Sequence, residues 1–205
     1  MKARHIAVDL DGVIFNFSDA YASLITAHTG IQFPKTCDTW PTCWFWERAA
    51  GVTPEQEAKV WKEGILKDDE NFWLNLKPMP EACVTATQLN HLQKIGHHVY
   101  FISNRAGDRA KIQTERALYN IGIDYPCLLF AADKVPLIRE LKIDFFADDR
   151  IETVNDVARV AEEENLPVKG HVFLKHALYN KDNRREDVKV VDTVMAALKQ
   201  EDLWK

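Results

Sequence analysis

The chain has 205 residues, of which 46% are hydrophobic and 28% charged, with 26 basic against 31 acidic side chains and a net charge of −5. This composition can bury a sizeable core without disulfides or metals, and it excludes disordered and collagen-like chains. The acidic balance, without a dense Lys/Arg run, argues against polynucleotide binding as the main task, because that requires a basic surface. A small anion could still bind in a local positive pocket.

The sequence also carries signals of location. No apolar run approaches the roughly 20 residues that a membrane span needs, and the first residues lead into a short strand rather than a secretion signal. The four cysteines (Cys37, Cys43, Cys83 and Cys127) form no C-x-x-C pair and lack the spacing of a zinc module, so we expect reduced, mostly buried thiols. We therefore predict a cytoplasmic protein without a membrane partner.

Short apolar runs rich in β-branched and aromatic residues predict strands at residues 6–10, 99–102, 127–130, 143–146 and 172–174. Stretches with helical periodicity lie between them, at 81–95, 108–121 and 151–165, and each ends beside a glycine or shortly before a proline. This alternation predicts an α/β fold with a flavodoxin/Rossmann-like parallel sheet and helices on both faces.

The interval from 11 to 98 is far too long for an ordinary crossover, which indicates an insertion. It contains an amphipathic stretch at 18–30 and a second helix start at 53–56, where the residues form a capping box around a proline. Five of the six tryptophans also fall in this interval. We predict two domains: a core of residues 1–16 and 78–205, and a small inserted helical cap of residues 17–77.

Ligands of open α/β sheets bind at the carboxyl ends of the strands, so polar residues that follow each apolar run are the first candidates for chemistry. These are Asp9, Asp11 and Gly12 after the first run, Ser103, Asn104 and Arg105 after the second, Asp133 and Lys134 after the third, and Asp148, Asp149 and Arg150 after the fourth. Several carboxylates cannot all stay ionised in one crevice without a compensating cation. Oxygen ligands without His or Cys favour a hard ion such as Mg²⁺, and this combination points to phosphate chemistry. Asp9 could then attack phosphorus, and Asp11 could protonate the leaving oxygen and activate water.

These residues also carry a family resemblance. In chain order, Asp9-x-Asp11-Gly12-Val13, Ser103, Lys134 and Asp148-Asp149 match the four motifs of the haloacid dehalogenase-like (HAD) phosphatase superfamily. Within it, the chain is most similar to the 5'(3')-deoxyribonucleotidases, which share the helical cap, the Asp-Lys and Asp-Asp-Arg motifs and an aromatic-proline stretch like residues 71–80. The resemblance implies a Mg²⁺-dependent phosphomonoesterase that dephosphorylates (deoxy)nucleoside monophosphates through an aspartyl-phosphate intermediate.

The resemblance also implies a role for each residue of the four motifs. Asp9 is the nucleophile and Asp11 the general acid and base, while Ser103 and Lys134 hold the phosphate. The Mg²⁺ ligands are Asp9, the backbone carbonyl of Asp11 and the acidic pair Asp148 and Asp149, of which we favour Asp149 as the direct ligand.

Two further sets of candidates concern the substrate. Aromatic residues of the cap enclose the nucleoside in that family, and the corresponding residues here are Phe17, Phe45, Trp46 and Trp61. The second motif departs from the family, because Ser103-Asn104-Arg105 replaces a Thr-Ser-Pro-like sequence. Since a guanidinium can clamp an oxyanion, we add Arg105, together with Asn104, to the phosphate-binding set.

The residues leave other functions open. The substrate could be another small phosphorylated metabolite, such as a sugar phosphate, or a polynucleotide 3'-end, which the acidic balance disfavours. A phosphoacceptor module of the receiver type also has acidic, hydroxyl and lysine side chains at strand ends, but it lacks the cap and the Asp11 partner. A nucleotide-binding protein without turnover is the third alternative. We expect a small-molecule phosphomonoester as partner, no polynucleotide, and a cap surface that could form a homodimer.

Overall fold

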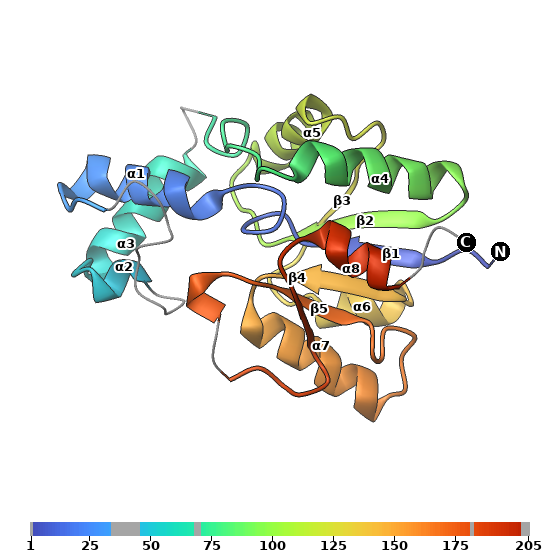
Figure 1. Cartoon of the computed structure of the whole chain (residues 1–205). Helices are drawn as coiled ribbons and strands as arrows, with labels where there is room; N and C mark the ends of the chain where they lie inside the picture. Colours follow the sequence, from blue (N-terminus) through green and yellow to red (C-terminus); the bar gives the residue numbers. More distant parts are fainter. Residues whose placement is uncertain (1, 34–45, 68–70, 181–182, 202–205) are drawn as a thin grey trace.

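A computed structural model describes residues 2–33, 46–67, 71–180 and 183–201 of the chain. Within these residues six parallel strands form one sheet in the order β3-β2-β1-β4-β5-β6 (Figure 1). The strands are β1 His5–Val8, β2 His98–Ser103, β3 Cys127–Phe130, β4 Phe145–Asp148, β5 Val172–Lys175 and β6 Lys189–Val191. This is the strand order of a Rossmann sheet, so the predicted fold class is confirmed.

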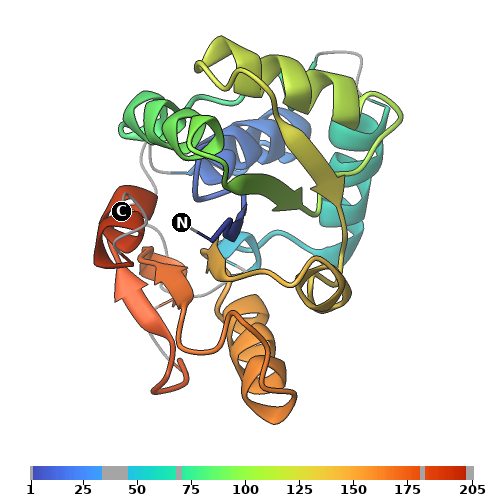
Figure 2. The same ribbon diagram turned by 90° about the vertical axis from the view of Figure 1, so that its right-hand side faces the viewer.

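Helices cover both faces of the sheet (Figure 2). One face packs against α4 (Ala82–Lys94), α5 (Ala110–Asn120) and α8 (Val194–Gln200), and the other against α6 (Val135–Glu140) and α7 (Ile151–Glu163). Strand β1 shows the alternation that this requires, because Ile6 and Val8 belong to the first core cluster and Ala7 to the second. The carboxyl end of this central strand is therefore held by packing from both sides.

In the part of the predicted insertion that the structure describes there are four helical segments: α1 Phe17–Thr29, α2 Trp46–Ala49, α3 Pro54–Val60 and the π-helical segment η2 Trp61–Leu66. They lie together beyond the carboxyl ends of the strands (Figure 1). Helix α1 ends at Gly30, whose φ of +76° suits the left-handed cap position. The predicted capping box at the start of α3 is confirmed, since Thr53 and Gln56 each accept from the other's backbone N–H.

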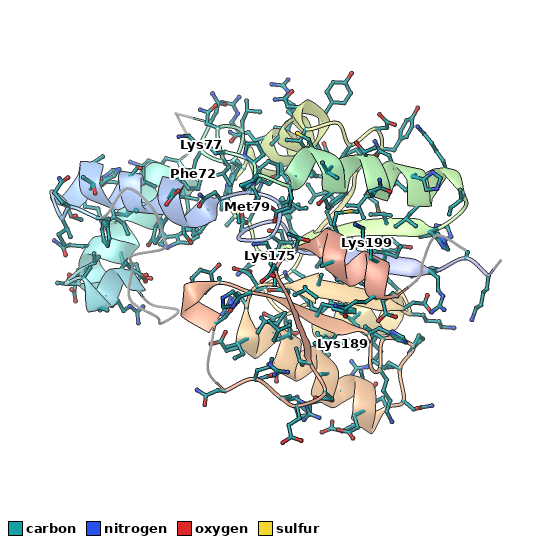
Figure 3. All side chains as sticks on the ribbon, viewed as in Figure 1. Phe72, Lys77, Met79, Lys175, Lys189 and Lys199 are labelled. Atoms are coloured by element: carbon teal, nitrogen blue, oxygen red, sulfur yellow. The ribbon has the colours of Figure 1, made fainter. Side chains whose placement is uncertain are left out.

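The chain leaves and re-enters the sheet region through two paired segments. The Asn16 N–H donates to the Lys77 carbonyl at 2.8 Å, and the Met79 N–H donates to the Ile14 carbonyl at 2.8 Å. Figure 3 shows Lys77 and Met79 on the returning segment, between the helices of the insertion and α4. The predicted boundaries at 16/17 and 77/78 fall at this pairing, and we keep the division into core and cap as our interpretation.

Two sequence expectations concern membrane-spanning segments and the cysteines. Among the described helices, none combines the length and the apolar character that crossing a bilayer requires. Cys83 and Cys127 are free and exposed, so the expectation of buried thiols is wrong for these two, while Cys37 and Cys43 lie outside the described residues.

Candidate active site

The turn after β1 positions Asp9. Its backbone N–H donates to the Ala147 carbonyl at 2.9 Å, so the pairing of β1 with β4 continues to this residue and fixes the backbone that carries the carboxylate. The chain then turns at Gly12, which has φ +77°, and a Cβ on this residue would lie 2.0 Å from Asp149 Oδ2. Only glycine satisfies both the backbone conformation and this close approach.

Lys134 joins the ends of two strands from its place just before α6. Its ammonium donates to Asp9 Oδ1 and, at 2.6 Å, to Asp148 Oδ2. The lysine and both carboxylates are almost fully buried. Asp148 Oδ1 also accepts from the Arg150 N–H at 2.8 Å, which orients this carboxylate toward Lys134.

Asp149 is held from the segment that follows β5. The Tyr179 hydroxyl donates to Asp149 Oδ2, and the side-chain amide of Asn180 donates to the Asp149 carbonyl at 2.7 Å. Oxygens of Asp9, Asp148 and Asp149 lie within 4.8 Å of one another. These three buried carboxylates are the group, among the described residues, whose chemistry suits a divalent cation.

Burial and mutual repulsion shape the charge of this cluster. Burial raises the pKa of Asp9 well above its ordinary value; Asp148 and Asp149 raise it further, and Lys134 opposes them. Burial, followed by repulsion from Asp148, raises the pKa of Asp149 from 3.8 to about 7, against the hydrogen bond from Tyr179. Burial alone would lower the pKa of Lys134, but Asp148 and Asp9 outweigh it and raise that pKa above its usual range. The Lys134 ammonium therefore stays charged, whereas burial and mutual repulsion favour the protonated forms of Asp9 and Asp149.

Asp11 has a different set of partners. Its Oδ2 accepts from the Ser103 hydroxyl at 3.2 Å and from Arg105 Nε at 3.0 Å, and its Oδ1 accepts from Arg105 Nη2 at 2.8 Å. The Asp11 side chain is 22% exposed, whereas that of Arg105 is fully buried. The structure thus brings Arg105 onto the second aspartate of the first motif.

A cavity of about 300 Å³ opens at this end of the sheet. The polar candidates that line it are Asp9, Asp11, Ser103, Asn104, Lys134 and Asp149. Aromatic rings line it as well: Phe17 lies 6.2 Å from Trp61 and 6.0 Å from Trp73 between ring centroids, stacked in both cases. The cavity therefore combines anionic and cationic groups with an aromatic wall.

Not every predicted site residue lines this cavity. Asp148 is buried behind it, and the guanidinium of Arg105 points to Asp11. Phe45 lies outside the described residues, and for Trp46 the description covers the backbone of α2 alone. The predicted roles of both aromatics stay predictions.

The structure adds residues that the sequence reasoning did not select. Glu57 of α3 lines the cavity and pairs with Arg48 at 2.8 Å, and Trp73 lines it from the returning segment. Tyr179 contacts Asp149, and Lys175 is a buried cation that lowers the pKa of that carboxyl. Lys175 follows the fifth apolar run directly, so the strand-end argument could have found it, whereas no local signal marks Tyr179 or Glu57.

Similarity to known proteins is found at the level of structure and not at the level of sequence. The sequence matches no protein-family model and no curated protein. A haloacid dehalogenase-like hydrolase from Burkholderia xenovorans LB400 superposes with a TM-score of 0.56 over 100% of this chain and 99% of its own, at 10% identity. A haloacid dehalogenase-like hydrolase from Bacteroides fragilis has a TM-score of 0.56 at 14% identity, covering 94% of this chain and 98% of its own.

A structure described as a β-phosphoglucomutase from Thermotoga maritima has a TM-score of 0.53 at 12% identity, over 97% of this chain and 98% of its own. At these identities the likeness concerns the fold and leaves the substrate open. It extends over nearly the whole of each chain. The chain has the fold of the haloacid dehalogenase-like hydrolases.

Proposed function

We propose that this protein is a Mg²⁺-dependent phosphomonoesterase that dephosphorylates (deoxy)nucleoside monophosphates through an aspartyl-phosphate on Asp9. The observation that carries the proposal is the meeting of Asp9, Asp11, Ser103 and Lys134 around one cavity at the carboxyl ends of parallel strands. Phosphoryl transfer requires a nucleophile, a proton donor and charge neutralisation at one place, and these side chains supply each of them.

The reaction has two steps. In the first, an Asp9 oxygen attacks phosphorus, the bond from phosphorus to the leaving oxygen breaks, and Asp11 donates a proton to that oxygen. In the second, water attacks phosphorus and gives its proton to Asp11, and the bond from phosphorus to the Asp9 oxygen breaks. Inorganic phosphate leaves, and the Asp9 carboxylate is regenerated. The cavity is lined by both carboxylates, which supports this division of roles.

Lys134 and Ser103 would act on the phosphate. The Lys134 ammonium is held by Asp9 and Asp148, so its charge is fixed in place before a substrate arrives. Preorganised charge of this kind stabilises negative charge that develops on the phosphoryl oxygens. Ser103 is fully buried and lines the cavity; its hydroxyl donates to Asp11 in this structure and would turn from that carboxylate to donate to a bound phosphoryl oxygen.

The residues present fit Mg²⁺. Three buried carboxylates face the Lys134 ammonium, and Lys175 adds a second buried cation, so the cluster keeps excess negative charge when all three carboxylates are ionised. An all-oxygen donor set with few protein ligands is the type that Mg²⁺ prefers, and Asp9 and Asp149 would hold it. When bound, the ion would neutralise charge on the phosphoryl oxygens.

The aromatic residues that line the cavity support the proposal that the leaving group is a nucleoside. Phe17 and Trp61 are partly exposed and line the cavity beside the catalytic candidates, while Trp73 is buried and stacks against Phe17. Base stacking on exposed rings contributes about 1–3 kcal/mol per base. A sugar phosphate would make little use of these rings.

Phosphate release from a panel of nucleoside 5'- and 3'-monophosphates and sugar phosphates, each with Mg²⁺ or with chelator, tests the proposal. We expect Mg²⁺-dependent turnover with the highest kcat/KM for a nucleotide. A preference for sugar phosphates would remove the nucleotide assignment but keep the phosphatase. A stable phosphorylated protein without repeated release would favour the phosphoacceptor alternative, and tight nucleotide binding without release the binding protein.

A further inference from the structure

Arg105, two residues after Ser103, is a buried cation beside the cavity. Its side chain is fully buried, and its guanidinium lies over two aromatic rings, 5.1 Å from the centroid of Phe15 and 4.9 Å from that of Trp73. A buried charge of this kind is costly unless it is paired and hydrogen-bonded. The fold therefore supplies partners for it, and these partners indicate what the residue does.

The partners are Asp11 and Thr114. Nε and Nη2 donate to the two oxygens of Asp11 at 3.0 and 2.8 Å, and Nη1 donates to Thr114 Oγ1 at 2.9 Å. The planar fork of an arginine matches a carboxylate in this bidentate geometry, which fixes orientation as well as distance. Thr114 on α5 and the two rings in turn hold the guanidinium, so Asp11 is tied to the packed core.

The contact leaves Asp11 open to the cavity. Each carboxylate oxygen can accept more than one hydrogen bond, and the Asp11 side chain is 22% exposed and lines the cavity. Arg105 approaches Asp11 from the buried side and is not one of the described residues that line the cavity. The guanidinium can thus orient Asp11 without contacting a phosphate bound beside Asp9 and Lys134.

We propose that Arg105 is a positioning residue that holds the Asp11 carboxylate in place for proton transfer to the leaving oxygen. The inference rests on the proposed function and replaces the phosphate contact that the sequence suggested for this residue. The buried ring of Trp73 joins Arg105 to the cavity wall, because it lies against the guanidinium and stacks against Phe17.

The test uses the leaving group. Departure of p-nitrophenolate needs little proton donation, whereas departure of a nucleoside alkoxide needs it, and kcat/KM reports the steps up to that departure. For Arg105→Met we expect kcat/KM to fall about 100-fold for a nucleoside monophosphate and less than about threefold for p-nitrophenyl phosphate. An equal loss for both substrates would overturn the proposal, whereas a wild-type protein that releases no phosphate would instead refute the proposed function.

A double-mutant cycle with Asp11→Asn separates positioning from a general structural effect. If Arg105 acts through Asp11, then Arg105→Met adds no further loss for the nucleotide once Asp11→Asn is present. Additive losses would contradict the proposal. The inhibition constant of inorganic phosphate should stay unchanged in Arg105→Met, and a clear rise in it would place the guanidinium on the phosphate instead.

Two further variants extend the test. Thr114→Val removes the acceptor that holds the guanidinium from α5, so we expect a smaller loss than in Arg105→Met with the same selectivity for the nucleotide, and an equal loss for both substrates would contradict the proposal. Arg105→Lys keeps the charge without the fork and should recover part of the nucleotide activity. If Arg105→Met does not fold, Arg105→Lys is compared on the same two substrates, where a selective loss for the nucleotide supports the proposal and an equal loss contradicts it.

Discussion

At the scale of single residues, the end-of-strand argument selects side chains well but does not give their contacts. Asp9, Asp11, Ser103 and Lys134 were predicted from local sequence, and the structure brings them to one cavity. The position of Arg105 could not be predicted, because its contact with Asp11 joins residues 94 positions apart and depends on burial over two rings. Tyr179 likewise contacts Asp149 from an irregular segment after β5.

Tyr179 leads to a prediction about metal affinity. Its hydroxyl donates to Asp149 Oδ2 and lowers the pKa of that carboxyl, so it favours the ionised form that binds a cation. Removing the hydroxyl in Tyr179→Phe should raise the dissociation constant for Mg²⁺ about tenfold, as is usual for residues that orient a metal ligand. Tyr119→Phe, at a tyrosine that is 71% exposed, is the matched control. An unchanged affinity, measured by titration calorimetry, would show that Tyr179 does not support the ligand.

At the scale of elements, long periodic stretches were predictable and short ones were not. The five predicted strands are present, with ends shifted by at most a few residues. Strand β6 was not predicted, because it has three residues, of which Lys189 and Val190 are exposed, and so it shows too short a hydrophobic pattern. Helix α6 has six residues and was missed for the same reason. The cap helix α3 was found because its capping box is a local signal.

The η2 segment carries a prediction about substrate choice. Trp61 begins η2 and stacks beside Phe17 in the cavity, so Trp61→Leu should remove one stacking surface. We expect KM for thymidine 5'-monophosphate to rise about tenfold, with no change for glycerol phosphate, which has no ring to stack. Leu66→Ala changes an exposed residue of the same segment and serves as control. An equal rise for both substrates would indicate a disturbed cap instead of a lost base contact.

At the scale of the whole molecule, the buried carboxylates link stability to pH. The pKa of Asp149 is about 7 in the folded chain against 3.8 ordinarily, so the folded state keeps a proton that the unfolded state has released. Stability of the metal-free protein therefore falls as pH rises from about 4 to about 7, the direction expected when a carboxyl pKa is raised by folding.

Thermal unfolding with chelator or Mg²⁺ checks this linkage. Between about pH 5.5 and about pH 8 the metal-free protein should lose on the order of 2 kcal/mol, or about 4–8 °C in Tm. Mg²⁺ should raise Tm more at the higher pH, because there it binds carboxylates that no longer hold the proton. Asp149→Asn should flatten the pH dependence. A metal-free Tm that increases over this interval would contradict the charge balance described for the cluster.

The most direct measurement of the central claim is initial-rate phosphate release by the wild type and by Asp9→Asn, both with Mg²⁺ and a nucleoside monophosphate. The substitution keeps the volume of a buried residue but removes the nucleophilic charge, so we expect turnover to fall at least about 10⁴-fold with Tm equal or higher. A folded Asp9→Asn protein that retains substantial turnover would contradict the aspartyl-phosphate mechanism.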